Sequence, residues 1–539
     1  MMSKHKYILP LLAFLMITFA ANAQQKIQWG DPIKNNTKSI LEKIITQDAT
    51  GFYALKTRQG KNKISDGPQK VYIERYDLNM NLKKAKEINL KWKKNKRQFE
   101  DIQMIGGELY LFTSYNNLAK RKNFLFAQRM NKQTFDVENK LNYIAEIDTR
   151  GEFKEGTFNF HISKDSSKVL ILNQLPYKKN QPEQFALHVY NNDLTLSWED
   201  NIILPYNDNQ FEIEDYQIDN DGNVYLLGVL YGDKIKARKR GLPNYQYVLL
   251  SYRNMGTEKE KYPIKIREKF ITDLTFRPSN TGELVFCGFY SEHGTYSIKG
   301  TYFFRLNPQT QQISNQSLKE LDFDFRTEYV SNRKRDRMDN DDKKAELYQF
   351  SLDDLILRND GGALLVAEQY FVEEIREYDQ FGVGAGVGRF DRFGNNNFRI
   401  SYIYNYNDII VVNIGPDGDI EWASRIPKRQ ETENDGGWYS SYSMSIVRDK
   451  INFIYNDNGR NFSGEIEDRR RGRYNFNGRN SVIALSQVSP DGTVSTTPLG
   501  QNRQAGVITR PKACKQIGPE TIAIYGENGK FYRFGKVGL

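Results

Sequence analysis

Four alternating glycines stand out in a segment that also carries arginines and aromatic residues. The segment FGVGAGVGRFDRFGNNN begins at Phe381. A dinucleotide-binding loop has the spacing G-x-G-x-x-G, which here would require glycine at position 387 or 389. Those positions hold Val387 and Arg389, and no Gly-Lys-Ser/Thr sequence ends the segment. We therefore expect an inserted loop that binds no nucleotide cofactor.

Positively charged side chains cluster in several polar segments. The candidate binding residues are Lys234, Lys236, Arg238, Lys239, Arg240, Arg389, Arg392, Arg469, Arg470, Arg471, Arg473, Tyr474 and Arg479, with Lys120, Arg121 and Lys122 as a smaller group. Arginine binds carboxylate and phosphate groups through paired hydrogen bonds and stacks on planar groups, as tyrosine does. The clusters predict a surface for an anionic or planar partner. The alternative interpretation is that each is a solvated loop.

Side chains that commonly perform catalysis are scarce. Beyond the N-terminal segment the histidines are His161, His188 and His293, and no two stand at a metal-ligand spacing. Cys287 and Cys514 lie in apolar segments, where a buried thiol is inert. There is no G-x-S-x-G sequence. We expect no metal, no cofactor and no catalytic residue of these types.

Acidic residues near the starts of several predicted strands keep one enzymatic hypothesis open. They are Asp101, Glu214, Asp215, Asp273, Asp353 and Asp354. Glycoside hydrolases act through a pair of carboxyl groups, so these are the candidates if the protein cleaves carbohydrate. Polar residues that line a wet channel or cap strand ends would have the same positions, and we favour this structural interpretation.

The segment DNDG, which begins at Asp219, resembles the first residues of a calcium-binding loop. The glutamate that such a loop needs at its twelfth position is replaced by Leu230. A tight turn between two strands accounts for the segment without a metal ion.

Eight similar hairpins must position these groups. Each consists of two apolar strands joined by a turn of Gly, Asp, Asn or Ser residues, and they occupy residues 44–58, 101–115, 160–174, 216–231, 274–290, 355–371, 445–457 and 514–527. A second strand pair follows each of the first seven hairpins, within residues 71–88, 124–140, 185–202, 247–264, 302–318, 409–426 and 482–499.

Four strands per repeating unit indicate a β-propeller, and we predict an all-β fold with a single ring of eight blades, seven being the alternative. The pattern D-x-D-G-N-x-Y-x-x-G at Asp219 to Gly228 also resembles repeats of secreted bacterial β-propellers. The WD, kelch and YWTD signatures are absent, so this resemblance implies a fold and no named family. Two tandem β-sandwiches are disfavoured because no Pro-, Gly- or Ser-rich linker divides the chain.

The eighth unit has three strands, and its last is residues 530–537. Near the N-terminus, Trp29 and Ile33 have the same four-residue spacing as two pairs in fourth strands, Trp198 with Ile202 and Trp422 with Ile426. We predict that residues 26–33 supply the missing strand and close the ring, which would leave no open sheet edge.

The first 23 residues have the features of a secretory signal peptide. Lys4 and Lys6 precede an apolar run, and Ala21 and Ala23 form a small-x-small end. We expect residues 24–539 to form the exported propeller, in the periplasm or associated with the outer membrane and cell surface. The formal charge of +10 would then fall to about +8.

Long connections are predicted to share one face of the ring. In a blade with strands a, b, c and d, the b–c and d–a connections emerge together, and the insertions at 324–345, 371–408 and 458–480 belong to these classes. We therefore predict a non-enzymatic binding or scaffolding module of the bacterial cell envelope. Its partner would be an envelope protein or an anionic glycan or lipid; nucleic acid fits an exported protein less well. The alternative is a carbohydrate-active enzyme or a glycan-binding propeller with axial carboxylates.

Overall fold

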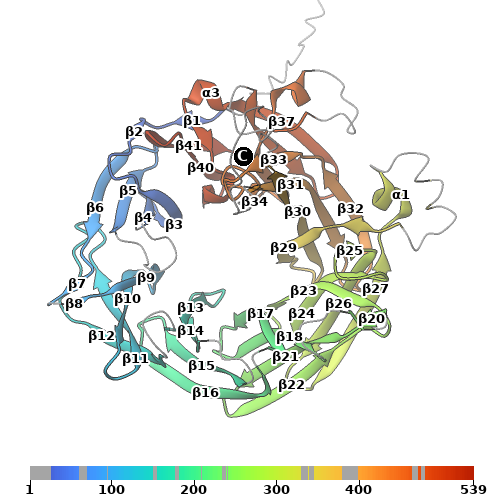
Figure 1. The fold of residues 1–539 in the computed structure, drawn as a ribbon, viewed down its shortest axis with the longest axis horizontal. Coiled ribbons are helices and arrows are strands. Elements are labelled where there is room, and N and C mark those ends of the chain that lie inside the picture. Colours follow the sequence, from blue (N-terminus) through green and yellow to red (C-terminus); the bar gives the residue numbers. More distant parts are fainter. Residues whose placement is uncertain are drawn as a thin grey trace, which may run out of the picture.

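The computed structural model describes residues 26–59, 70–93, 95–149, 155–176, 181–207, 209–232, 238–239, 241–328, 335, 338, 345–378, 398–463, 472–474 and 480–539. These residues form eight antiparallel sheets arranged as blades around a central axis (Figure 1). The predicted eight-bladed β-propeller is therefore confirmed. The first strand of each blade lies nearest the axis and the last lies at the rim.

The first four blades follow one another without interruption. Blade 1 consists of β3 (Ile40–Asp48), β4 (Gly51–Arg58), β5 (Lys70–Asp77) and β6 (Leu82–Ile88), and blade 2 consists of β9 (Gln98–Ile105), β10 (Glu108–Asn117), β11 (Lys122–Met130) and β12 (Asn142–Asp148). Blade 3 consists of β13 (Thr157–Ile162), β14 (Lys168–Gln174), β15 (Pro182–Asn191) and β16 (Leu196–Asn207). Blade 4 consists of β17 (Phe211–Ile218), β18 (Val224–Tyr231), β21 (Tyr245–Arg253) and β22 (Glu258–Ile264). Short strand pairs β7–β8 (Lys91–Trp92, Asn95–Lys96) and β19–β20 (Arg238–Lys239, Leu242–Pro243) lie in connections.

Blade 5 consists of β23 (Phe270–Pro278), β24 (Leu284–Ser291), β26 (Gly300–Asn307) and β27 (Gln312–Glu320), and blade 6 consists of β29 (Phe350–Leu357), β30 (Ala363–Tyr378), β31 (Phe398–Ile414) and β32 (Ile420–Ile426), with β33 (Gln430–Glu433) paired to β31. Blade 7 consists of β34 (Tyr442–Val447), β35 (Lys450–Asn458), β36 (Ser481–Val488) and β37 (Val494–Gln501). Blade 8 contains β38 (Ile508–Thr509), β39 (Lys515–Gly518), β40 (Thr521–Glu527) and β41 (Phe531–Gly538). Short helical turns are α1 (Phe323–Thr327), η2 (Gly459–Phe462), α3 (Asn502–Ala505) and η4 (Pro511–Ala513).

The hydrophobic core is divided among the interfaces between neighbouring blades. Each of eight buried clusters joins the facing sides of two adjacent blades, and the cluster between blades 8 and 1 completes the circle. Middle strands such as β18, VYLLGVLY, are apolar at nearly every position because both of their faces pack against a neighbouring blade. Rim strands such as β22 alternate in exposure because one of their faces is solvated.

The ring closes with a strand from the N-terminal end, as predicted. Strand β1 (Gln28–Trp29) pairs with β41 in the register Trp29 to Gly535, and β2 (Ile33–Lys34) continues the pairing with Ile33 opposite Tyr532. Blade 8 therefore combines β38, β39, β40 and β41 from the C-terminal end with β1 and β2 from the N-terminal end of the described chain. Strands β1 and β2 cover the outer edge of β41.

Blade 2 departs from the sequence-based expectation. The sequence pattern predicts the third and fourth strands within residues 124–140, but the fourth strand is β12 (Asn142–Asp148). Within the expected segment, Met130 and Val137 form only an isolated bridge. The backbone turns at Asn131, whose carbonyl accepts from the amide of Phe135, and this turn separates the strands.

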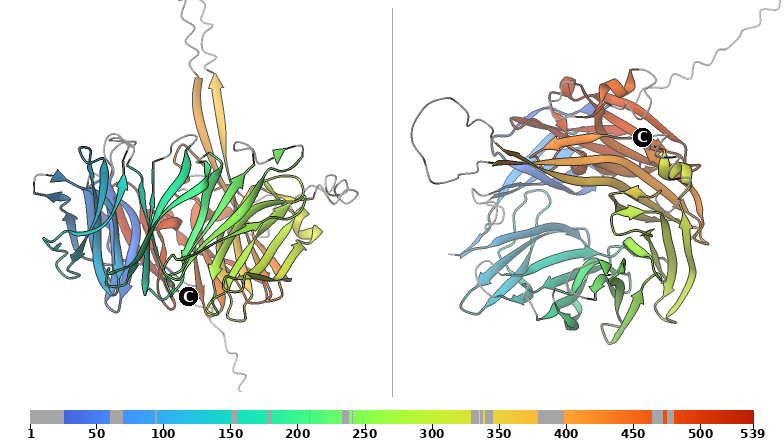
Figure 2. Two further views of the ribbon diagram at one scale, coloured as in Figure 1. Left: turned by 90° about the horizontal axis from the view of Figure 1, so that it is seen from below. Right: turned by 45° about the vertical axis from the view of Figure 1, so that its right-hand side comes forward.

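One hairpin projects from the ring on the face where the b–c connections emerge. Strands β30 and β31 stay paired from Ala363 and Ile414 out to Tyr378 and Phe398. Figure 2 shows this hairpin standing clear of the other blades. Residues 379–397, which include the glycine-rich segment, lie outside the described part of the chain.

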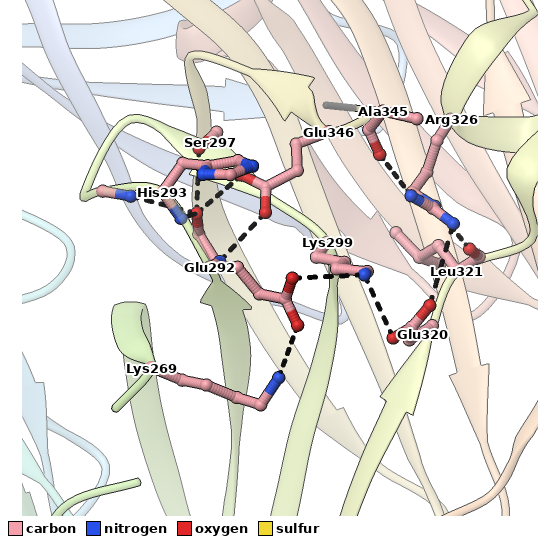
Figure 3. Close-up of polar contacts among 12 residues, drawn as sticks. Lys269, Glu292, His293, Ser297, Lys299, Glu320, Leu321, Arg326, Ala345 and Glu346 are labelled. Atoms are coloured by element: carbon pink, nitrogen blue, oxygen red, sulfur yellow. Dashed lines mark hydrogen bonds and ion pairs between the residues drawn. The ribbon is translucent and has the colours of Figure 1, made fainter. Parts of the chain in front are cut away.

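The connection between blades 5 and 6 is anchored by a cluster of charged side chains (Figure 3). The buried Lys299 ammonium lies 3.4 Å from a carboxylate oxygen of Glu292 and 3.3 Å from one of Glu320. Arg326, on α1, donates to the carbonyls of Leu321, at 2.7 Å, and Ala345. This network fixes both described ends of the connection against blade 5.

Among the described residues, no helix is long and apolar enough to cross a membrane. The predicted signal peptide, residues 1–23, lies outside the described residues and stays a prediction.

Candidate functional site

A cavity of about 630 Å³ opens where the innermost strands of blades 6, 7 and 8 meet. Strand β29 contributes Asp353 and Asp354, β34 contributes Tyr442, and η4 contributes Lys512. The second and third strands of blade 6 reach the same cavity through Glu368 and Tyr370, on β30, and Tyr406, on β31. We call this cavity the channel pocket because its innermost strands lie next to the axis.

Asp353 is the most unusual acid of the channel pocket. It is the extra residue of a β-bulge, since the pairing of β29 with β30 skips from Leu352 to Asp354. The hydroxyl of Tyr442 donates to its carboxylate at 2.7 Å. Desolvation by the surrounding protein raises the pKa of Asp353 to about 7, although the side chain still reaches solvent. This carboxyl can therefore gain or lose a proton near neutral pH.

A buried ion pair forms the base of the channel pocket. The Lys428 ammonium lies 2.6 Å from the Glu368 carboxylate, and both side chains are almost fully buried. The hydroxyl of Ser441 donates to the second carboxylate oxygen at 2.7 Å, and Lys428 also donates to the carbonyl of Tyr406 at 2.9 Å. With its partners satisfied, Glu368 joins blades 6 and 7 and is not free to bind a ligand.

Aromatic side chains line the wall above this base. The ring centroids of Tyr370 and Tyr406 are 4.6 Å apart, and the Lys512 ammonium lies 4.5 Å from the Tyr406 centroid. Side chains on the same face continue up the projecting hairpin, because Val372 is opposite Tyr404 and the two strands alternate regularly there. Val372 is 42% exposed, Tyr402 41% and Ile400 36%. We call Tyr370, Val372, Ile400 and Tyr402 the hairpin stripe.

The channel pocket and the hairpin stripe form one continuous surface. It offers an ionisable carboxyl, tyrosine hydroxyls, a lysine and exposed apolar area. Such a surface can bind an extended polar chain that contacts the axis at one end and the hairpin at the other.

Most of the other candidate carboxylates serve structural contacts. Asp101 pairs with Lys43 at 2.6 Å. Asp215 accepts from the Thr275 hydroxyl at 2.7 Å and from Arg277 at 3.1 Å. These contacts link neighbouring blades.

The other three carboxylates of the set lie on the first strands of blades 4, 5 and 6. Asp273 accepts from the backbone amide of Leu352 at 2.8 Å, and desolvation raises its pKa to about 6. Asp354 lies 3.6 Å from Arg277. Glu214, like Asp353, is the extra residue of a β-bulge, and desolvation raises its pKa to about 7.

The contacts and burial of two histidines and both cysteines are described by the structure. The Nε2 atom of His161 hydrogen-bonds the side-chain amide oxygen of Gln217 at 3.1 Å, and His188 lies 3.3 Å from Glu199. Burial raises the pKa of both thiols, that of Cys514 to about 12. Among the described residues, no three His, Cys, Asp or Glu side chains are grouped to hold a metal ion.

Few of the predicted basic binding residues can be placed. Lys234, Lys236, Arg240, Arg389, Arg392, Arg469, Arg470, Arg471 and Arg479 lie outside the described residues, and only the backbone of Arg238 and Lys239 is described, in β19. Arg473 forms an ion pair with Glu431. Tyr474 is 1% exposed, so its ring is packed inside the protein. Its backbone amide donates to the carbonyl of Arg429 at 2.9 Å.

Most of the channel pocket leaves no signal in the sequence. Glu368, Lys428 and Tyr442 lie in three separate segments without a motif. The one available signal was the double acid Asp353–Asp354 at the start of a strand, which also occurs as Glu100–Asp101 and Glu214–Asp215.

Comparison with known proteins gives similarity of fold alone. The β-propeller domain of the Trilobed protease from Pyrococcus furiosus is 8% identical with a TM-score of 0.35, and the match covers 86% of this chain and 98% of that chain. Synechocystis apocarotenoid oxygenase is 10% identical (TM-score 0.32; 87% and 88% covered), and Penicillium chrysogenum α-L-arabinanase is 7% identical (TM-score 0.30; 64% and 93% covered). No protein-family model and no curated protein matches the sequence.

Proposed function

We propose that the protein is an exported binding module of the bacterial cell envelope that holds a protein partner on its b–c and d–a face. The observation that carries this proposal is the continuous surface from the channel pocket to the hairpin stripe. Large apolar side chains exposed together on a projecting hairpin are typical of an interaction site. The basic segments predicted on the same face would add charge to it.

The test is affinity capture of partners from native envelopes by the tagged mature protein, at low and moderate salt. Tyr370→Ser with Tyr402→Ser should remove a stoichiometric protein partner. The matched control is Tyr143→Ser, since this tyrosine is 56% exposed but lies on the rim strand of blade 2. Equal capture by both variants would contradict the proposal.

A second set of variants tests the basic segments. Changing Arg469, Arg470 and Arg471 to Glu should weaken capture most at low salt, because exposed charges are less screened there. Lys450→Glu, an exposed residue at an a–b turn on the opposite face, is the control.

Carbohydrate binding or hydrolysis is a second candidate function, favoured by Asp353. A carboxyl with a pKa of about 7 can act as a general acid at neutral pH, and the adjacent tyrosines offer rings on which sugars pack. Incubation with envelope glycans should then release reducing ends, and Asp353→Asn should abolish that release. Absence of turnover in the wild type would remove the hydrolytic form of this candidate.

A further inference from the structure

The projecting hairpin has one covered edge and one open edge. Strand β33 pairs with β31 from Ile403 opposite Glu433 to Tyr406 opposite Gln430, and the amide of Asn434 donates to the carbonyl of Tyr402 at 2.9 Å. On the other side, β29 pairs with β30 only as far as Phe350 opposite Gln369. Beyond that point, in the described part of the chain, β30 has no second neighbouring strand.

The alternation of the backbone shows which groups face the open edge. The amide of Tyr370 donates to the carbonyl of Gln349 at 3.0 Å, so it points away from β31. Because alternate residues of a strand point their backbone groups to the same side, the amide and carbonyl of Val372 point there too. An edge that presents such groups is a template for another strand.

We propose that this edge of β30 receives an extended, basic segment of the protein partner by β-strand addition, an inference that rests on the proposed function. Main-chain hydrogen bonds would supply affinity, and side chains alternating along the added strand would supply specificity. The hairpin stripe offers apolar contacts to every second residue of the segment.

The charge of the edge selects the chemistry of the partner. Glu373 is exposed on β30. A second copy of this chain that paired antiparallel at the same edge, centred on this residue, would bring the two copies of Glu373 opposite one another, which is unfavourable. Lysine or arginine in the added strand would instead pair with Glu373. The occupant is therefore a basic segment of a different protein.

The test uses the full mature protein and labelled eight-residue peptides, measured by fluorescence polarisation. A peptide of alternating lysine and valine should bind, whereas its glutamate–valine counterpart and a lysine–valine peptide with N-methylated backbone should not. Val372→Pro removes the outward amide at a position where an edge strand tolerates proline. It should weaken binding about tenfold or more, and at least about threefold more than Val372→Ala, which keeps the amide and shortens the side chain. Thermal unfolding confirms that both variants fold.

Three outcomes would overturn strand addition. They are no binding of the lysine–valine peptide, equal binding of its N-methylated form, and equal binding by Val372→Pro and the wild type. None of them contradicts the proposed function. That function fails if the variant with Tyr370→Ser and Tyr402→Ser captures the envelope partner as the wild type does. Concentration-dependent dimerisation that Val372→Pro abolishes would show that a second copy occupies the edge, and would also overturn the proposal.

Discussion

A lysine at the junction of blades 1 and 8 is completely enclosed by protein. Lys56 is 0% exposed, and its ammonium lies 3.1 Å from the centroid of the Tyr532 ring and 3.6 Å from a carboxylate oxygen of Glu74. That carboxylate accepts from the hydroxyls of Tyr76, at 2.6 Å, and Tyr532, at 2.7 Å. Desolvation lowers the pKa of Lys56 from 10.5 to about 8, and the Glu74 carboxylate opposes this shift.

Lys56 should therefore make stability depend on pH. Between about pH 8 and 10.5 the unfolded chain keeps the proton that the folded chain has lost, so the free energy of unfolding rises with pH. Relative to Lys56→Met, the wild type should gain up to about 3 kcal/mol across this window. Urea unfolding of both proteins at pH 7.5 and pH 10 measures the difference. If the difference in the free energy of unfolding between the two proteins were the same at both pH values, Lys56 would keep its proton in the folded state.

Asp353 and Tyr442 make a second prediction for single residues. Because the Tyr442 hydroxyl donates to the charged carboxylate, it lowers the pKa of Asp353 against the larger effect of desolvation. Tyr442→Phe should raise that pKa above its wild-type value of about 7. Carbon-13 NMR titration of the carboxyl measures both values, with Asp353→Asn used to assign the signal. An unchanged or lower pKa in Tyr442→Phe would contradict the contact.

At the scale of elements, the turn at Asp219 shows how a hairpin is fixed without a metal ion. One carboxylate oxygen of Asp219 accepts from the backbone amides of Asp221, at 3.0 Å, and Asn223, at 2.9 Å. The other accepts from the side-chain amide of Asn223 at 2.8 Å. Gly222 has a φ of +87°, a conformation that glycine adopts without strain.

Asp219→Ala should destabilise the protein by about 1–3 kcal/mol, because several donors lose their acceptor. Asp221→Ala removes an exposed side chain from the same turn and should change stability by less than about 0.5 kcal/mol. Denaturant unfolding with and without calcium measures both variants. Calcium-dependent stability in the wild type that Asp219→Ala removes would favour the calcium-loop interpretation instead.

The local sequence pattern predicts the repeated hairpins, but it does not predict features that depend on contacts between residues distant in the sequence. The eight hairpins follow from alternation and turn residues, both of which are local. The sequence pattern places the extension of β30 to Tyr378 within an inserted connection, because Val372 and Ile375 among glutamates do not distinguish a strand from a loop. The channel pocket depends on contacts such as Lys428 with Glu368, which are 60 residues apart and leave no trace in the sequence.

At the scale of the whole molecule, ring closure depends on very few residues. Strands β1 and β2 contain two residues each, yet they cover the edge of β41. Trp29 and Ile27 pack against Gly535, where the space for a Cβ is already filled, and Arg533 donates to the carbonyl of Gly30 at 2.9 Å. Both spatial neighbours of blade 8 depend on this closure, because its buried clusters continue into blades 1 and 7.

A shortened chain that begins at residue 35 should fold into a less stable ring that associates through β41. Removing the N-terminal strands exposes an apolar edge with unpaired backbone groups, so we expect a lower melting temperature and concentration-dependent oligomers. Thermal unfolding and analytical ultracentrifugation measure the two effects. A synthetic peptide of residues 26–34 should restore the monomer, whereas the same peptide with Trp29→Ala and Ile33→Ala should not. If the shortened chain stayed monomeric with an unchanged melting temperature, the stability of the ring would have to come from the blade interfaces alone.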